Sequence, residues 1–277
     1  MVGNENSWHH LQPPRHPRRA GYQRWPIGLD GGQKAGGAPD EGSGTPHAGT
    51  GRRRLPSVRC FLGSGCPAFS GGDSVSDEPW LDEFKELATN GRSRLMFDIG
   101  ANAGDWSEWG RRSFARVVAF DCDKRAVKSL RQRFDEASNV EVVYSAVAEV
   151  NRITTVYMRP AAEQTSLLEV HPIGGTRQAD APVESIEFVE AKTLDALAAR
   201  HGDPDFVKVD VEGAEAMVLA GATARCFRRC RWLIEVHDRG PAVGRHLERL
   251  GYRDCRIIRH PLPDAHPEHY WVYLESK

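Results

Sequence analysis

Acidic and glycine residues follow an apolar run in the segment FDIGANAGDWS, residues 97–107. The pattern is typical of a strand that ends at Asp98 and turns through Gly100 and Gly104 into a helix. Glycines let a backbone approach a ligand where a Cβ would collide, and a helix start offers unpaired N–H groups. We assign four residues of this turn to a predicted cofactor site: Asp98, Gly100, Asn102 and Gly104.

A second acid ends the next apolar run, VVAFD, at Asp121. Ligands of open α/β sheets bind at the carboxyl ends of the strands, where an acid in this position accepts both hydroxyls of a ribose. Asp121 is therefore predicted to hold a nucleoside. We assign Cys122, which follows Asp121, and Ala146 to the same site.

The residue types around the turn distinguish between nucleoside cofactors. NAD sites favour Gly-x-Gly-x-x-Gly, whereas the middle position here is Asn102, and Asp105 would repel a pyrophosphate. A P-loop needs a Gly-Lys-Ser/Thr that is absent from this turn. S-adenosylmethionine fits better, because it has no phosphate and its ammonium group can pair with Asp98 directly or through water. A tight turn in which Asp98 only caps the helix is the structural alternative.

A second acidic segment, DFVKVDVEGAE, covers residues 205–215. Asp210 ends a predicted strand, and Glu212 follows it on the same side. Two carboxylates at the ligand edge suggest a catalytic role with a substrate hydroxyl, a cation or a sulfonium as partner. Lys208 either pairs with a neighbouring acid or contacts substrate, and Glu215 has a favourable place in the first turn of a helix.

The segment WLIEVHD ends another predicted strand, on which Glu235 and His237 share one side. His237 is a candidate general base because its ordinary pKa lies near neutrality, and a structural hydrogen bond is the alternative. A divalent ion held by Asp210, Glu212 and Glu235 is possible but not favoured, and we assign no metal ligand. Three further histidines are interpreted as parts of a surface loop: His260, His266 and His269.

Strand-like and helix-like segments alternate from about residue 76 onwards, which predicts an α/β fold. We expect a mostly parallel sheet with helices on both faces and an antiparallel hairpin at its C-terminal edge, formed by residues 252–259 and 269–276. A β-rich segment, residues 152–192, is expected to shape a pocket for the acceptor.

Residues 1–75 differ in composition from the rest of the chain. They contain more than half of the 27 glycines and about half of the 17 prolines. Such a segment buries too little apolar surface to offset the entropy of ordering, so we predict a disordered tail. Residues 76–277 are predicted to form one domain.

The composition of the chain indicates which classes of binding partner and which cellular compartment to expect. The formal net charge of −1 argues against a nucleic-acid partner, and no apolar run is long enough for a membrane helix. The 6 cysteines form no C-x-x-C pair and are expected to be reduced thiols. We therefore expect a cytoplasmic protein without a membrane partner, and we assign no oligomeric state.

Five segments, in this order, resemble the FkbM family of S-adenosylmethionine-dependent methyltransferases. They are FDIGANAGDWS, VVAFD, QTSLLE, KTLDAL and FVKVDVEGAEAMVLAGA. The resemblance implies a class I methyltransferase (Rossmann-like) fold and O-methylation of a hydroxyl, often on a sugar or natural product. The usual Phe-Glu-Pro after the second strand is here Phe-Asp-Cys, which keeps the ribose-binding acid as Asp121.

We therefore expect an S-adenosylmethionine-dependent methyltransferase that acts on a small-molecule or carbohydrate acceptor. Asp210 or His237 would remove the proton of the acceptor hydroxyl. A non-catalytic nucleoside-binding module and, less favoured, an NAD-dependent oxidoreductase are the alternative functions.

Overall fold

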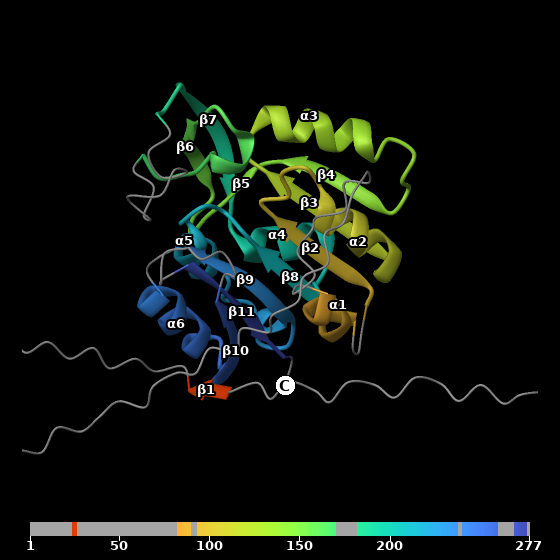
Figure 1. The fold of residues 1–277 in the computed structure, drawn as a ribbon, viewed down its shortest axis with the longest axis vertical. Coiled ribbons are helices and arrows are strands. Elements are labelled where there is room, and N and C mark those ends of the chain that lie inside the picture. Colours follow the sequence, from red (N-terminus) through yellow and green to blue (C-terminus); the bar gives the residue numbers. More distant parts are fainter. Residues whose placement is uncertain are drawn as a thin grey trace, which may run out of the picture.

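The computed structural model describes residues 24–26, 82–89, 93–169, 182–237, 240–259 and 269–275. Its described strands form one large and one small sheet, and helices pack around the large one (Figure 1). The large sheet has the order β1-β10-β11-β9-β8-β2-β3-β4. Its strands, in that order, are β1 (Arg24–Pro26), β10 (Asp254–Arg259), β11 (His269–Leu274), β9 (Arg231–His237), β8 (Phe206–Val209), β2 (Leu95–Ile99), β3 (Arg116–Asp121) and β4 (Val140–Tyr144).

The five strands β9, β8, β2, β3 and β4 run parallel. Every residue of β2, β8 and β9 is buried, as expected for near-continuous apolar strands that are covered on both faces. The parallel arrangement brings the carboxyl ends of β2, β3, β8 and β9 to one edge of the sheet. The acids predicted from sequence therefore gather at that edge.

The C-terminal strands confirm the predicted antiparallel hairpin. β11 pairs antiparallel with β9 on one side and with β10 on the other. Although β11 comes last in the sequence, it lies between β9 and β10. The pairing places His269 opposite His237 and Trp271 opposite Glu235.

The described tripeptide Arg24–Pro26 departs from the expectation of a disordered tail. It forms β1 and pairs antiparallel with residues 254–256 of β10. An edge strand such as β10 offers unpaired backbone groups, which a short extended segment can satisfy without a hydrophobic core of its own. The other residues of the predicted tail lie outside the described residues.

Deletion of residues 1–75 should lower the melting temperature by only about 2–4 °C, because β1 adds three residues to an edge of the sheet. Circular dichroism melting of the full chain and the truncated chain measures this difference. A deletion of residues 1–20, which keeps β1, is the matched control. A loss of more than about 10 °C on the longer deletion alone would contradict the prediction.

Helices cover both faces of the large sheet, as predicted. The helices are α1 (Asp82–Thr89), α2 (Asp105–Ser113), α3 (Lys124–Arg133), α4 (Leu194–His201), α5 (Glu215–Ala220) and α6 (Gly240–Arg249). The apolar side chains of α4, α5 and α6 join one core with the sheet, and those of α1, α2 and α3 pack on the other face. Two described 3₁₀ helices cover Ala162–Gln164 and Arg225–Arg228.

The predicted β-rich segment forms the small sheet, with the order β5-β7-β6. Its strands are β5 (Ala146–Val147), β7 (Ser185–Lys192) and β6 (Arg152–Met158). β6 and β7 pair antiparallel, and β5 continues from the end of β4 and pairs parallel with β7. The small sheet therefore stands beside the ligand edge of the large one (Figure 1).

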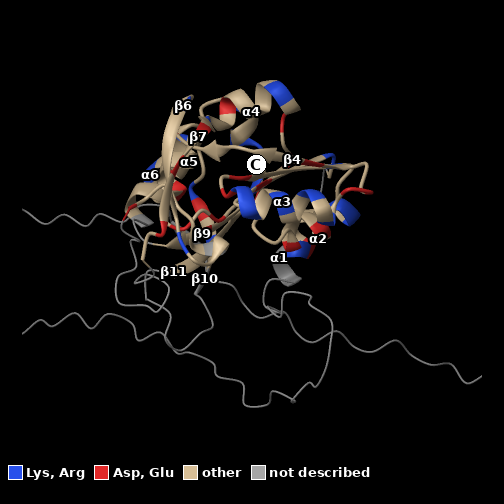
Figure 2. Ribbon diagram, turned by 90° about the horizontal axis from the view of Figure 1, so that it is seen from above, with Lys and Arg blue, Asp and Glu red and all other residues tan. Residues whose placement is uncertain are grey.

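The start of α3 and the orientation of its faces follow from a side-chain cap and from the placement of its charged residues. The Asp123 side chain accepts a hydrogen bond from the N–H of Arg125 at 2.7 Å, which satisfies one unpaired donor at the helix start. Basic residues form bands along α3 (Figure 2), while its buried face contains Ala126, Val127 and Leu130.

In the part of the chain that the structure describes, no helix has the length and apolar character to cross a bilayer.

Candidate cofactor site and acidic–histidine cluster

The turn after β2 is held against β3 and β8. The N–H groups of Gly100 and Ala101 both donate to the carbonyl of Phe120, at 2.9 and 3.1 Å. Gly100 has a φ of +73°, and a Cβ at this position would lie 1.8 Å from the carbonyl oxygen of Asp210. Glycine is thus required here by the end of the neighbouring strand, whereas the sequence suggested close approach to a ligand.

Gly104 serves packing, and its predicted role in cofactor binding stays a prediction. It has a φ of +89° and immediately precedes α2. A Cβ on Gly104 would lie 2.7 Å from the side chain of Leu130 and 2.8 Å from that of Phe134. Its glycine lets the end of α3 pack against the turn, and Gly104 does not line the cavity described below.

Asp98 is fully buried and is engaged within the protein. Its Oδ2 accepts a hydrogen bond of 2.6 Å from the hydroxyl of Ser107, and its Oδ1 lies 3.4 Å from the ammonium of Lys208. Burial raises the pKa of Asp98, while Lys208 and Ser107 oppose the rise. Asp98 does not line the cavity and contacts Lys208, so its contact with a cofactor ammonium, directly or through water, stays a prediction.

Lys208 connects the two acidic segments. Its Nζ donates to the carbonyl of Gly100 at 2.7 Å and lies 3.4 Å from both Asp98 Oδ1 and Asp210 Oδ2. Burial alone would lower the pKa of Lys208, but Asp210 and Asp98 outweigh burial and raise it. Of the two roles considered for Lys208, the structure therefore supports the ion pair.

A cavity opens at the carboxyl edge of the large sheet, beside the small sheet. Seven of the ten residues predicted for the site line it: Gly100, Asn102, Asp121, Cys122, Ala146, Asp210 and Glu212. They come from the ends of β2, β3 and β8 and from β5, which the parallel pairing brings together. Asp98, Gly104 and His237 are the three that do not line it.

Asp121 is oriented by backbone donors. Its Oδ2 accepts from the N–H of Asn102 and its Oδ1 from the N–H of Asp123, both at 2.8 Å. Burial raises the pKa of Asp121 to about 6, and the two backbone hydrogen bonds limit the rise. Each carboxylate oxygen keeps lone-pair capacity for a further donor in the cavity.

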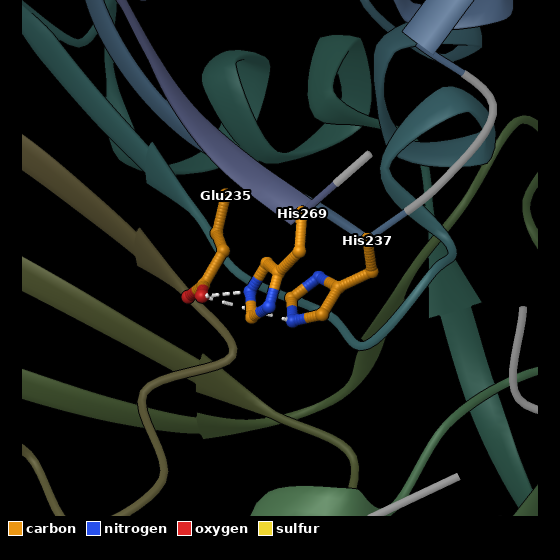
Figure 3. A group of neighbouring side chains, drawn as sticks. All are labelled: Glu235, His237 and His269. Carbon is orange, nitrogen blue, oxygen red and sulfur yellow. Dashed lines mark hydrogen bonds and ion pairs between the residues drawn. The ribbon is translucent and has the colours of Figure 1, made fainter. Parts of the chain in front are cut away.

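The second group of acids lies where β8 and β9 end. Val209 pairs with Ile234, so Asp210 and Glu235 follow at adjacent ends of the two strands, as the sequence predicted. Glu235 and His237 point to the same side of β9, and His269 joins them from β11 (Figure 3). His269 Nε2 lies 2.6 Å from Glu235 Oε1, and the rings of His237 and His269 stack with centroids 4.7 Å apart.

The location of His269 corrects the interpretation of its segment as a surface loop. His269 is the first residue of β11, and its side chain is only 13% exposed. His260 and His266 lie outside the described residues.

His237 is surrounded by carboxylates. Its Nδ1 lies 2.9 Å from Glu215 Oε1, while its Nε2 lies 3.5 Å from Glu212 Oε2 and 3.8 Å from Glu235 Oε1. Glu215 Oε1 also accepts from the N–H of Gly213 at 2.8 Å. Glu215 thus orients the histidine ring, a role beyond the helix-dipole effect expected from its position in the sequence.

This environment bears on the predicted role of His237 as a general base. Burial alone would lower the pKa of His237, but Glu212, Glu215 and Glu235 outweigh burial and raise it well above the ordinary value. Protonation of both ring nitrogens would remove the lone pair with which a general base accepts a proton, so the role of His237 as the base stays a prediction. Asp210 and Glu212 are the predicted catalytic residues that reach the cavity.

The sequence profile of the methyltransferase FkbM domain matches residues 98–256, which run from the acid at the end of β2 into β10. The chain belongs to this family of methyltransferases. The sheet order and the helices on both faces agree with the class I methyltransferase fold that the resemblance implied.

Individual relatives are distant from this FkbM domain. A probable ribosomal RNA small subunit methyltransferase A from Methanosarcina barkeri is 30% identical over 67 residues, which are 24% of this chain and 23% of that protein. The crystal structure of methyltransferase FkbM from Methylobacillus flagellatus is 18% identical with a TM-score of 0.46, over 66% of this chain and 44% of that one. An rRNA methylase from Streptococcus thermophilus is 13% identical with a TM-score of 0.41, over 70% and 92% of the two chains.

Part of the cavity wall of this FkbM domain was not assigned residue by residue. Ser145 and Val147, at the end of β4 and in β5, were not predicted. The 3₁₀ helix Ala162–Gln164 and the residues after it contribute Ala162, Thr165, Ser166 and Leu167, which lie within residues 152–192, the segment expected to shape a pocket. Three of these belong to the QTSLLE motif that contributed to the family resemblance. The motif was therefore a usable signal for the site, although its residue types alone indicate no particular chemistry.

Buried polar groups hold this wall in place. The guanidinium of Arg159, a residue only 1% exposed, donates to the carbonyls of Gln164, Leu168 and Glu169 at 2.9–3.2 Å. The Ser166 hydroxyl donates to the carbonyl of Glu212 at 2.8 Å. The bond from Ser166 connects the wall to the segment of the predicted catalytic acids, where Glu212 has a left-handed φ of 52°.

Proposed function

We propose that this FkbM domain transfers a methyl group from S-adenosylmethionine to a hydroxyl of a small-molecule or carbohydrate acceptor. The observation that carries the proposal is the Asp121 carboxylate, which two backbone N–H groups orient at the cavity beside the Gly100 turn. A carboxylate held in this way at the end of the second strand is suited to accept the ribose hydroxyls of the cofactor.

The acceptor would bind at the other end of the cavity. Asp210 and Glu212 line that end, and their charges favour the sulfonium of the donor nearby. In the reaction, the acceptor oxygen forms a bond to the methyl carbon as the carbon–sulfur bond breaks. S-adenosylhomocysteine leaves, and one of these carboxylates takes the hydroxyl proton, either directly or through water.

Asp121→Ala should weaken S-adenosylmethionine binding by at least about 100-fold, because it removes two charge-assisted hydrogen bonds of about 1.5–3 kcal/mol each. Isothermal calorimetry with S-adenosylmethionine and S-adenosylhomocysteine measures the affinity. Asp105→Ala, which changes an acid at the start of α2 outside the cavity, is the control. Equal affinity in the Asp121 variant and the wild type would remove Asp121 from the site.

The affinity should also depend on pH in a defined direction. The ionised carboxylate is the better acceptor of ribose hydroxyls, and the pKa of Asp121 in the free protein is about 6. Affinity should therefore fall as the pH decreases through about 6, and this fall should be absent in Asp121→Asn. The same decrease in the Asn variant would assign the pH dependence to another group.

Turnover distinguishes the proposal from a non-catalytic binding module. With isotope-labelled methyl donor, metabolite extracts incubated with the protein should yield a labelled product. Product with acid-stable label on oxygen supports O-methylation. Tight cofactor binding without any labelled product would favour the binding module, and tight NAD binding would favour the oxidoreductase.

A further inference from the structure

The geometry points to a second ligand site next to the cofactor cavity. We propose that Glu235, His237 and His269 bind a divalent first-row transition metal ion, with open coordination positions towards Asp210 and Glu212. The sequence interpretation considered an ion held by carboxylate oxygens and did not favour it, and it placed His269 in a surface loop. The structure adds two imidazoles to the carboxylates.

The donor atoms have the spacing of a ligand set. One ligand atom from each of Glu235, His237 and His269 lies within 4.8 Å of the others, and the same holds for Asp210, Glu212 and His237. Glu235 Oε1 lies 2.6 Å from His269 Nε2 and 3.8 Å from His237 Nε2. Donors bound to one ion at about 2.1 Å lie about 3.0–3.4 Å apart, so these two pairs would need to move by a few tenths of an ångström to hold one ion.

The orientation of His237 matches that of a metal ligand. Its Nδ1 faces Glu215 Oε1 at 2.9 Å, which leaves Nε2 directed at the carboxylates of Glu212 and Glu235. Metal-bound histidines commonly donate their other ring N–H to a carboxylate, which fixes the tautomer and raises the basicity of the ligand. Glu215 is fully buried and occupies this position.

The balance of buried charge favours a cation at this place. Four carboxylates surround the cluster: Asp210, Glu212, Glu215 and Glu235. The nearby Lys208 already lies between Asp98 and Asp210. Glu215 and Glu235 are buried, whereas the side chains of Asp210 and Glu212 are 27% and 21% exposed at the cavity. Carboxylates held so close together repel one another unless a proton or a cation lies between them, and a divalent ion supplies two charges at their common centre.

The donor set also selects the class of ion. Two imidazoles and a carboxylate suit Mn²⁺, Fe²⁺, Co²⁺ or Zn²⁺, whereas Mg²⁺ and Ca²⁺ prefer oxygen ligands throughout. Because Asp210 and Glu212 also line the cavity, an ion here could hold the acceptor oxygen and lower the pKa of its hydroxyl. This role in methyl transfer rests on the proposed function, but the presence of the ion does not.

Co²⁺ is the probe for the test, because its visible absorption reports imidazole coordination. The full chain, stripped of metal with a chelator, should take up one Co²⁺ with ligand-field bands that Zn²⁺ abolishes and millimolar Mg²⁺ does not. Glu235→Gln and His269→Ala should each weaken binding by at least about 10-fold, and Glu215→Gln by about 10-fold through the orientation of His237.

Controls separate this site from other histidines, since the chain has 11 of them. His246→Ala changes a histidine of α6 outside the cluster and should leave Co²⁺ affinity unchanged. X-ray absorption of the Zn²⁺-loaded wild type should show two imidazole ligands and needs no variant to fold. Wild-type affinity in both Glu235→Gln and His269→Ala, an oxygen-only shell, or no ligand-field band at millimolar Co²⁺ would overturn the proposal.

Calorimetry with S-adenosylmethionine on the same metal-free preparation keeps the two proposals distinct. Cofactor binding without a specific Co²⁺ site would defeat the metal site and leave the proposed function standing. Specific Co²⁺ binding without cofactor binding would defeat the proposed function and leave the metal site standing.

Discussion

Gly100→Ala is expected to destabilise the protein by at least about 3 kcal/mol and to abolish cofactor binding. A φ of +73° costs a residue with a Cβ about 1–2 kcal/mol, and the added Cβ would lie 1.8 Å from the carbonyl oxygen of Asp210. The end of β2 and the end of β8 would have to separate, because a backbone carbonyl cannot rotate away as a side chain does. Urea unfolding and calorimetry with S-adenosylmethionine measure the two effects.

Gly251→Ala is the matched control for this substitution. Gly251 has a φ of +90°, but a Cβ there would meet no atom within 4 Å. Gly251→Ala should lower the free energy of unfolding only by the cost of the positive φ, about 1–2 kcal/mol, and should leave cofactor affinity unchanged. Similar losses of stability in the two variants would show that the contact with Asp210 is not what requires glycine at position 100.

Lys208→Met should destabilise the fold by about 3–5 kcal/mol at neutral pH, because it leaves two carboxylates without their buried cation. The ammonium lies 3.4 Å from both Asp98 and Asp210, and the Lys208 side chain is only 3% exposed. The exposed pair of Lys192 and Glu190 provides a control, since Lys192→Met should change stability by less than about 1 kcal/mol. Denaturant unfolding measures both variants.

The pH dependence of the Lys208 variant has a definite sign. Without the cation, the pKa of Asp98, which burial already raises, should rise further, and the pKa of Asp210 should rise above its value in the unfolded chain. A carboxyl group with a raised pKa destabilises the fold above that pKa and ceases to do so once protonated. The loss caused by Lys208→Met should therefore shrink as the pH falls from 8 to 5, and adding Asp98→Asn should recover part of it. A pH-independent loss would point to packing instead of charge.

The local sequence pattern was sufficient to predict the strands and helices and the Asp121 side of the cavity. Alternating strands and helices indicated the parallel sheet, and the acid that ends β3 was predicted as the ribose-binding Asp121, which does line the cavity. The topology of adjacent parallel strands also brought Asp210 and Glu235 together without any knowledge of side-chain conformation.

The structure differs from the sequence-based interpretation of Asp98 and His269 because their contacts come from residues far away in the sequence. Asp98 looked available to a ligand because its partners, Ser107 and Lys208, lie in the next helix and in a strand 110 residues away. His269 looked like a loop residue because only the register of β11 against β9 places it opposite His237. The prolines before His269 masked the start of that strand, and no local periodicity predicts such a register.

The position of β11 has a consequence for the order in which the protein folds. β10 precedes β11 in the chain, yet among the described strands it contacts the sheet only through β11 and β1. Until β11 inserts, β9 presents an open, apolar edge, and β10 is the nearest segment that could pair with it wrongly. Non-local insertions of this kind are slow and expose strands to aggregation. We therefore expect refolding to be limited by the insertion of β11, after the parallel half of the sheet has formed.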